Sequence, residues 1–239
     1  MPAPFVLDAL TFAVAAWLIY CLRLPSRTAP PKRAIWTETK EGGAWILAHR
    51  EILQLAIMLG FLNAMNIAFL TVMILFAQEV LGLSAAGYGI LLTAGAAGGV
   101  IGGVTCPTVA RTLGNRLSIL VALALIAASF AMAATTSSTW ITGFCLGLSM
   151  FGGVLWNIVT VSYRQRHIPD ALLGRVNSIY RFFGWGMMPL GALIGGGLMA
   201  LTAPEIGREM AIRLVFITSA IGTLCLWIYA GLALKITQK

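Results

Sequence analysis

Amide side chains occur inside apolar stretches of the chain, where a polar group is costly and therefore marks a candidate site. Asn63 and Asn66 lie three residues apart, on one face of an expected helix. Asn157 stands beside Trp156 in a later apolar stretch. An amide offers a donor and an acceptor, so these residues either hold and release a polar part of a small molecule or form hydrogen bonds between helices. We take these four residues as candidate substrate contacts.

A cation also lies within an apolar stretch. Arg181 is six residues, about 9 Å of helix rise, beyond Arg175. Its guanidinium can extend to the polar interface of a membrane, or it can face an inner cavity and attract an anionic or phenolate-bearing substrate. Trp185, four residues further on, can stack on such a substrate or on Arg181 itself.

Nothing in the sequence predicts a catalytic, metal or cofactor site. The four cysteines stand alone in different apolar stretches, and we expect them to be small buried side chains: Cys21, Cys106, Cys145 and Cys225. Ser149 has no histidine within reach, because His49 and His167 fall in expected cytoplasmic segments. The chain also lacks a phosphate-binding loop. We therefore expect neither an enzyme nor a bound cofactor.

The composition is that of a membrane protein. Of the 239 residues, 59% are hydrophobic and 10% are charged, and the mean hydropathy is +0.89. Soluble domains carry about a quarter charged residues. A single soluble core, a disordered chain and a nucleic-acid-binding domain are therefore excluded.

The apolar residues form runs long enough to cross a bilayer as helices. They are continuous rather than alternating, which excludes the strands of a barrel. The seven expected spans are Phe5–Leu22, Ile52–Ala77, Gly87–Ala110, Leu117–Ala134, Trp140–Ser162, Val176–Thr202 and Ile212–Leu234. The predicted fold class is an all-α polytopic membrane protein with seven transmembrane helices.

The cations predict the orientation. Thirteen of the 16 fall in residues 23–51, 111–116, 163–175 and the tail after Leu234, whereas the opposite loops hold only Arg208 and Arg213. Because cationic loops stay in the cytoplasm, we expect the N-terminus outside and the C-terminus inside. The expected location is the cytoplasmic membrane of a bacterium.

The longest connection divides the chain into three parts. Residues 23–51 contain Pro25, Pro30 and Pro31 and then an amphipathic stretch, Trp36 to Arg50, which predict a cytoplasmic linker followed by an interfacial helix. The expected domains are residues 1–22, one transmembrane helix; residues 23–51, the linker; and residues 52–239, a bundle of six helices.

In two of the expected spans, glycines recur at every fourth residue. This spacing leaves one helix face without side chains, so that another helix can approach closely. Gly95, Gly99 and Gly103 follow this spacing, as do Gly191 and Gly195. The pattern favours either a surface on which helices move or static packing. The two glycine-rich spans are the middle helices of two triplets that enter the membrane from opposite sides, as in an inverted-topology repeat.

Three stretches resemble a known family. The segment LGLSAAGYGILLTAGAAGGVIGGVTCPTVARTLGNR, the segment IPDALLGRVNSIYRFFGWGMMPLGALIGGGLMA and the first span with its basic linker resemble the C-terminal part, helices six to twelve, of a major facilitator superfamily transporter. The chain is similar to the drug and siderophore exporters that include the enterobactin exporter and macrolide efflux proteins.

The resemblance implies a fold of two six-helix bundles around a central cavity, of which this chain carries the second. It also implies a cytoplasmic loop pattern of glycine, aspartate, basic, any, glycine, basic, basic. Arg111 occupies the acidic place of that pattern and Asn115 a basic one, while Gly114 and Arg116 match. These departures put a charge-relay latch in doubt, and Gly103, Arg111, Gly114 and Arg116 become candidate gate elements.

The expected function is secondary active efflux of small amphipathic molecules such as drugs or siderophores, driven by an ion gradient. The expected partners are the lipid bilayer, the small-molecule substrate, and the missing N-terminal half or a second copy, with no nucleic acid. The alternative is a non-transporting membrane scaffold or assembly protein derived from a carrier.

Overall fold

The computed structural model describes residues 3–22 and 35–236, which belong to two separate units, residues 1–34 and residues 35–239. The first unit contains α1 (Ala3–Cys21), and every side chain described in it is exposed. A helix that is apolar on all sides is typical of a membrane-embedded segment. The predicted linker over residues 23–34 lies outside the described residues.

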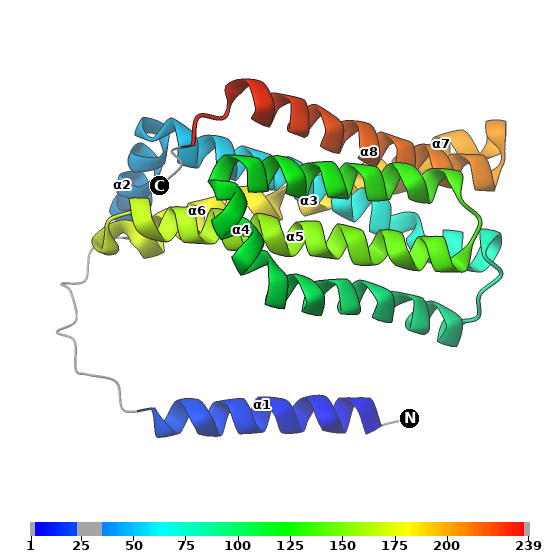
Figure 1. Cartoon of the computed structure of the whole chain (residues 1–239), viewed down its shortest axis with the longest axis horizontal. Coiled ribbons are helices and arrows are strands. Elements are labelled where there is room, and N and C mark those ends of the chain that lie inside the picture. Colours follow the sequence, from blue (N-terminus) through cyan, green and yellow to red (C-terminus); the bar gives the residue numbers. More distant parts are fainter. Residues whose placement is uncertain (1–2, 23–34, 237–239) are drawn as a thin grey trace. The chain divides into compact units, whose positions relative to one another are not determined.

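The second unit is a bundle of helices, shown in Figure 1. In chain order these are α2 (Ile35–Ala48), α3 (Arg50–Leu75), the π-helical turn η1 (Phe76–Val80), α4 (Ala85–Thr135), α5 (Thr139–His167), α6 (Asp170–Gly186), α7 (Met188–Ile206) and α8 (Arg208–Ala233). No strand occurs in residues 3–22 and 35–236. In Figure 1, α2 lies at the end of the bundle opposite to the α7–α8 turn.

Five helical segments of the described chain are long and apolar enough to cross a membrane: Arg50–Val80, Ala85–Thr135, Thr139–His167, Asp170–Ile206 and Arg208–Ala233. The second of these contains a kink at Gly114 and so accounts for two of the expected spans. Together with the shorter apolar helix Phe5–Cys21, they confirm the predicted all-α, multi-span fold class.

The first correction concerns the expected loop Arg111–Arg116, because the helix continues on both sides of a single residue. Only Gly114 leaves the helical conformation within α4, with φ 73° and ψ 172°. A side chain at positive φ meets steric strain, whereas glycine does not. One glycine therefore turns the chain where the sequence predicted a short loop.

The second correction concerns the expected span Val176–Thr202, which is a broken helix. It begins earlier, at Asp170, and is interrupted at Met187 between α6 and α7. Pro189 stands in the first turn of α7. Because proline has no N–H and its ring collides with the carbonyl of the residue four positions before it, an unbroken helix through Trp185 and Pro189 is disfavoured.

The core joins helices that are distant in sequence. Phe69 of α3 packs on Phe130 of α4 with ring centroids 4.5 Å apart and on Phe216 of α8 at 4.4 Å. Phe76 of η1 meets Phe216 edge-on at 5.0 Å. All four rings are buried, so this aromatic cluster fixes α3, α4 and α8 against one another.

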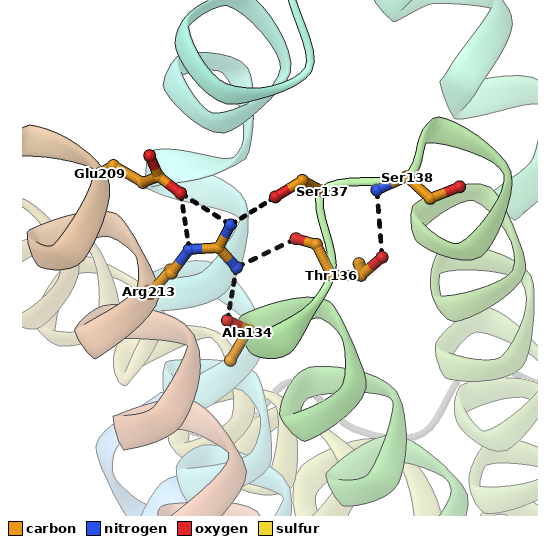
Figure 2. Close-up of polar contacts among 6 residues, drawn as sticks. All are labelled: Ala134, Thr136, Ser137, Ser138, Glu209 and Arg213. Atoms are coloured by element: carbon orange, nitrogen blue, oxygen red, sulfur yellow. Dashed lines mark hydrogen bonds and ion pairs between the residues drawn. The ribbon is translucent and has the colours of Figure 1, made fainter.

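Arginines of α8 bind the ends of neighbouring elements. Arg213 donates to the carbonyl oxygens of Ala134 (2.7 Å) and Thr136 (3.0 Å) and to Ser137 Oγ (2.7 Å), and it pairs with Glu209, as Figure 2 shows. The last carbonyl groups of a helix lack hydrogen-bond partners within the helix. Arg213 therefore provides donors for carbonyl groups at the C-terminal end of α4. Arg208 pairs in the same region with Glu79 of η1 through its Nε at 2.8 Å.

The amphipathic helix α2 packs on α6 at the other end of the bundle. Arg175 of α6 binds Glu38 and Glu41 of α2, each at 2.7 Å. A Cβ at Gly42 would lie only 3.1 Å from the side chain of Arg175. The helix thus forms close to its predicted range, and its place in the membrane interface stays a prediction.

The cysteine prediction is wrong for two of the four residues. Cys106 and Cys145 are buried as expected, but Cys21 and Cys225 are exposed. Cys21 lies in α1, whose described side chains are all exposed, and Cys225 lies on the outward side of α8. An exposed cysteine on an apolar helix face is compatible with lipid, since the thiol is a weakly polar group.

Candidate functional site

A cavity of about 280 Å³ lies among α3, α4 and α5. Four of the predicted substrate contacts line it, two from α3 and two from α5. Its polar lining consists of Asn63, Asn66, Ser149, Trp156 and Asn157. Much of the remaining wall is apolar and includes Leu59, Leu62, Phe69, Leu92, Leu146 and Met150. An apolar pocket with a few convergent polar groups is the usual form of a small-molecule site.

Asn63 has a bond to another helix besides its place in the cavity wall. Its Nδ2 donates to the carbonyl oxygen of Gly184 at 2.9 Å. Gly184 lies in the last turn of α6, where carbonyl groups lack a partner within the helix. Asn63 therefore stabilises the break between α6 and α7, which is one of the two roles that the sequence left open.

Asn66 and Asn157 leave more of their polar groups available. The half-buried Asn66 side chain makes no hydrogen bond to the described residues, and the exposed Asn157 donates to Gly153 of its own helix at 3.0 Å. The Asn66 amide and the Asn157 carbonyl oxygen can therefore exchange hydrogen bonds with a polar ligand in the cavity.

Trp156 carries an unsatisfied donor. Its side chain is only 1% exposed, and its Nε1 is buried without a hydrogen-bond partner in the described structure. Leaving such a donor unpaired costs about 1–3 kcal/mol. Trp156 belongs to the cavity wall, but its Nε1 atom is covered by protein, so the ring contributes an apolar surface to the cavity rather than a donor.

Sequence reasoning missed Ser149, Phe69 and Met150 as cavity residues, having tested Ser149 only as a nucleophile. All three line the cavity. Ser149, Gly153 and Asn157 stand four residues apart along α5 and so share a helix face. That spacing of small and polar residues is the signal that would have found Ser149.

Arg181 and Trp185 lie elsewhere on α6. The guanidinium carbon of Arg181 stands 5.7 Å from the centre of the Trp185 ring, and both side chains are exposed. Neither belongs to the lining of the cavity. Of the two stacking partners considered for Trp185, the structure places Arg181 beside it, and a role of either residue in substrate contact stays a prediction.

The candidate gate residues do not form one cluster of contacts. Gly103 is exposed with open space around it, and Arg111 donates to Thr108 Oγ1 at 3.3 Å within its own helix. Arg116 donates to the carbonyl oxygen of Gly231 near the end of α8 at 2.6 Å. Gly114 forms the kink of α4 between Arg111 and Arg116. The gating role of all four residues stays a prediction.

The candidate packing glycines differ in how tightly they are enclosed. A Cβ at Gly191 of α7 would collide with the carbonyl oxygen of Ala64 in α3, and one at Gly195 would stand 2.7 Å from that of Ala68. Across the α4–α5 contact, a Cβ at Gly99 would lie 3.2 Å from the Met150 side chain, and one at Gly95 would lie 3.7 Å from the Leu146 side chain. Of these four glycines, Gly191 is the most tightly enclosed, and the α4 and α5 backbones approach equally closely at Gly98, where a Cβ would collide with the carbonyl oxygen of Gly147.

The multi-span helical bundle defines a polytopic membrane protein. Comparison with known families gives the particular group, because residues 1–188 match the family model described as Major Facilitator Superfamily. The chain belongs to the major facilitator superfamily. Its members are transporters rather than enzymes, so the partners include the lipid bilayer and a small-molecule substrate. No curated protein and no solved structure gives a match.

The two asparagines of α3 give a test of their separate roles. Asn63→Leu removes the bond to the Gly184 carbonyl, and hydrogen bonds between membrane helices contribute about 0.6 to 1.7 kcal/mol. We expect Asn63→Leu to lower the melting temperature of the purified protein by a few degrees, roughly as that free energy implies. Asn66→Leu, the matched control, should leave it unchanged. Equal destabilisation by the two variants would contradict this assignment.

Proposed function

We propose that this protein exports small amphipathic molecules, such as drugs or siderophores, through the cavity among α3, α4 and α5. The observation that carries the proposal is the pair of amides, Asn66 and Asn157, in an otherwise largely apolar cavity wall. The apolar wall suits the hydrophobic part of an amphipathic cargo, and the amides suit its polar part. The predicted contacts with Arg181 and Trp185 would belong to an earlier, cytoplasmic part of the pathway.

A second bundle would complete the site. Leu70, Leu92 and Met150 line the cavity and are 39%, 41% and 50% exposed, so part of the wall faces outward from the six-span bundle. An aqueous pathway needs protein around it, because lipid cannot solvate a polar cargo. We propose that an N-terminal half or a second copy of the chain provides the opposite wall.

The cation distribution supports an orientation with the N-terminus outside and the C-terminus in the cytoplasm of a bacterium. An ion gradient would supply the energy, since the sequence has no phosphate-binding loop. Gating is proposed where α4 bends at Gly114 and where Arg116 of α4 binds the Gly231 carbonyl of α8, together with Gly103 and Arg111.

Accumulation of the amphipathic dye ethidium in bacteria tests this proposal. Cells that express the chain together with an N-terminal half, which provides the opposite wall, should accumulate less dye than cells that express the chain alone. Asn66→Leu should remove this difference at equal protein level. Strong efflux by the chain alone, shown to be monomeric by crosslinking, would contradict the need for a second wall. Labelling of the segment around Lys32 from outside the cell would contradict the proposed orientation.

The alternative of a non-transporting scaffold draws on the close approach of Gly191 to Ala64, which static packing explains without motion. It predicts that replacing Asn63, Asn66 or Arg181 by alanine leaves every phenotype intact, while Gly99→Leu or Gly191→Leu abolishes it. The export proposal predicts that both sets of changes matter.

A further inference from the structure

A buried arginine at the α5–α6 end of the bundle has no role in the cavity. Arg164 belongs to the last turns of α5 and is 9% exposed. The α5–α6 turn lies at the end of the bundle that also carries α2 (Figure 1). An ionised side chain is rarely buried to this extent without a partner of opposite charge. The loss of hydration costs an isolated charge roughly several kcal/mol.

The contacts of Arg164 are with neutral groups. Its Nη1 donates to Asn177 Oδ1 at 2.6 Å and its Nε to the carbonyl oxygen of Thr160 at 3.3 Å. The guanidinium carbon lies 3.7 Å from the centre of the Tyr180 ring. These contacts orient the guanidinium, but none supplies a negative charge.

Three arginines of the described bundle have carboxylate partners. Arg175 binds Glu38 and Glu41, Arg208 binds Glu79, and Arg213 binds Glu209. No carboxylate forms an ion pair with Arg164 within residues 3–22 and 35–236. The carboxylates of these pairs already bind other arginines and do not neutralise Arg164.

A second cation increases the positive potential at this place. Arg181 is four residues from Asn177, on the same side of α6, and Asn177 is the residue that Arg164 contacts on that helix. Arg181 is exposed, so an anion can reach it from outside. Two nearby guanidinium groups without an acid between them are stabilised by an anion that both can contact.

We propose that Arg164, Asn177 and Arg181 bind a phosphate oxyanion at the α5–α6 end of the bundle. Guanidinium groups match the oxygens of phosphate in spacing and charge. The Asn177 amide accepts from Arg164 through its oxygen, which leaves its NH₂ group as a further donor. The phosphate comes either from the headgroup of an anionic phospholipid or from a soluble ion, and the site is separate from the export cavity.

Two arms of one experiment separate these sources. In the first, inorganic phosphate is titrated into the purified full chain in detergent at constant ionic strength, and the melting temperature and tryptophan fluorescence are measured. In the second, the chain is placed in nanodiscs of phosphatidylcholine with or without phosphatidylglycerol, and the melting temperature is compared. Trp185 is one of the seven tryptophans that contribute to this fluorescence, and it lies near the site because Arg181 stands over its ring.

We expect a stabilising shift in at least one arm. Arg181→Gln should weaken the apparent affinity by about tenfold, as expected for the loss of a charged hydrogen bond. Arg164→Gln should do the same. Arg166→Gln, which removes an exposed cation two residues from Arg164 on α5, should change the affinity less than about twofold, because surface charges contribute little.

The arm that shows the shift identifies the source of the phosphate. No shift in either arm would overturn the proposal, and so would a shift that Arg166→Gln reduces as much as Arg181→Gln, since that would indicate general attraction to a basic surface. If Arg164→Gln fails to fold, the comparison of Arg181→Gln with Arg166→Gln decides the question, because both side chains are exposed.

Discussion

Gly191→Ala is expected to lower the melting temperature of the purified protein by about 5–10 °C, the shift that roughly 2–3 kcal/mol of overpacking produces in a chain of this size. The added methyl group would overlap the carbonyl oxygen of Ala64. A backbone carbonyl in a helix cannot rotate away, so α7 would have to move from α3. Thermal unfolding in detergent measures the effect.

Neighbouring glycines of α7 provide the controls. Gly196→Ala puts the same methyl group into open space, and Gly195→Ala puts it 2.7 Å from the Ala68 carbonyl oxygen. We expect almost no loss for Gly196→Ala and an intermediate loss for Gly195→Ala. If Gly196→Ala destabilises the protein as much as Gly191→Ala, helix flexibility rather than close packing explains the effect.

Gly153→Phe is expected to abolish dye efflux in the assembled transporter while leaving its stability unchanged. Gly153 lines the cavity, and a Cβ placed on it meets no atom within 4 Å. A phenyl ring would therefore enter the 280 Å³ space without displacing a helix. Efflux should fall to the level of cells that lack the protein, and the melting temperature should stay within about 2 °C of the original, as for surface substitutions.

The matched control is Gly89→Phe. Gly89 of α4 is exposed, also has nothing within 4 Å of a Cβ, and lies outside the cavity lining. Efflux should continue in this variant. Normal efflux by Gly153→Phe at normal protein level would show that the cargo takes another route.

The sequence predicted the helices and four of the cavity residues for a physical reason. Unbroken apolar runs have few alternatives to a spanning helix, and polar residues within them face protein or water. That reasoning found Asn63, Asn66, Trp156 and Asn157, which come together in the cavity.

The rest depended on contacts between distant segments. The break at Met187 also involves Asn63 of α3, whose amide binds the Gly184 carbonyl 121 residues away. Arg164 was counted only as a loop cation, because sequence spacing does not reveal that Asn177 and Tyr180 enclose it. The single-residue kink at Gly114 was expected as a loop, since glycine and arginine in a short segment are typical of one.

The aromatic cluster has a consequence for biosynthesis. Phe216 of α8 packs on Phe69 of α3, and α8 follows every other helix that it contacts in chain order. While a ribosome makes the chain, α3 and α4 therefore leave the translocon before Phe216, the ring that completes the cluster, exists. The aromatic core of the nascent bundle therefore stays incomplete until α8 emerges.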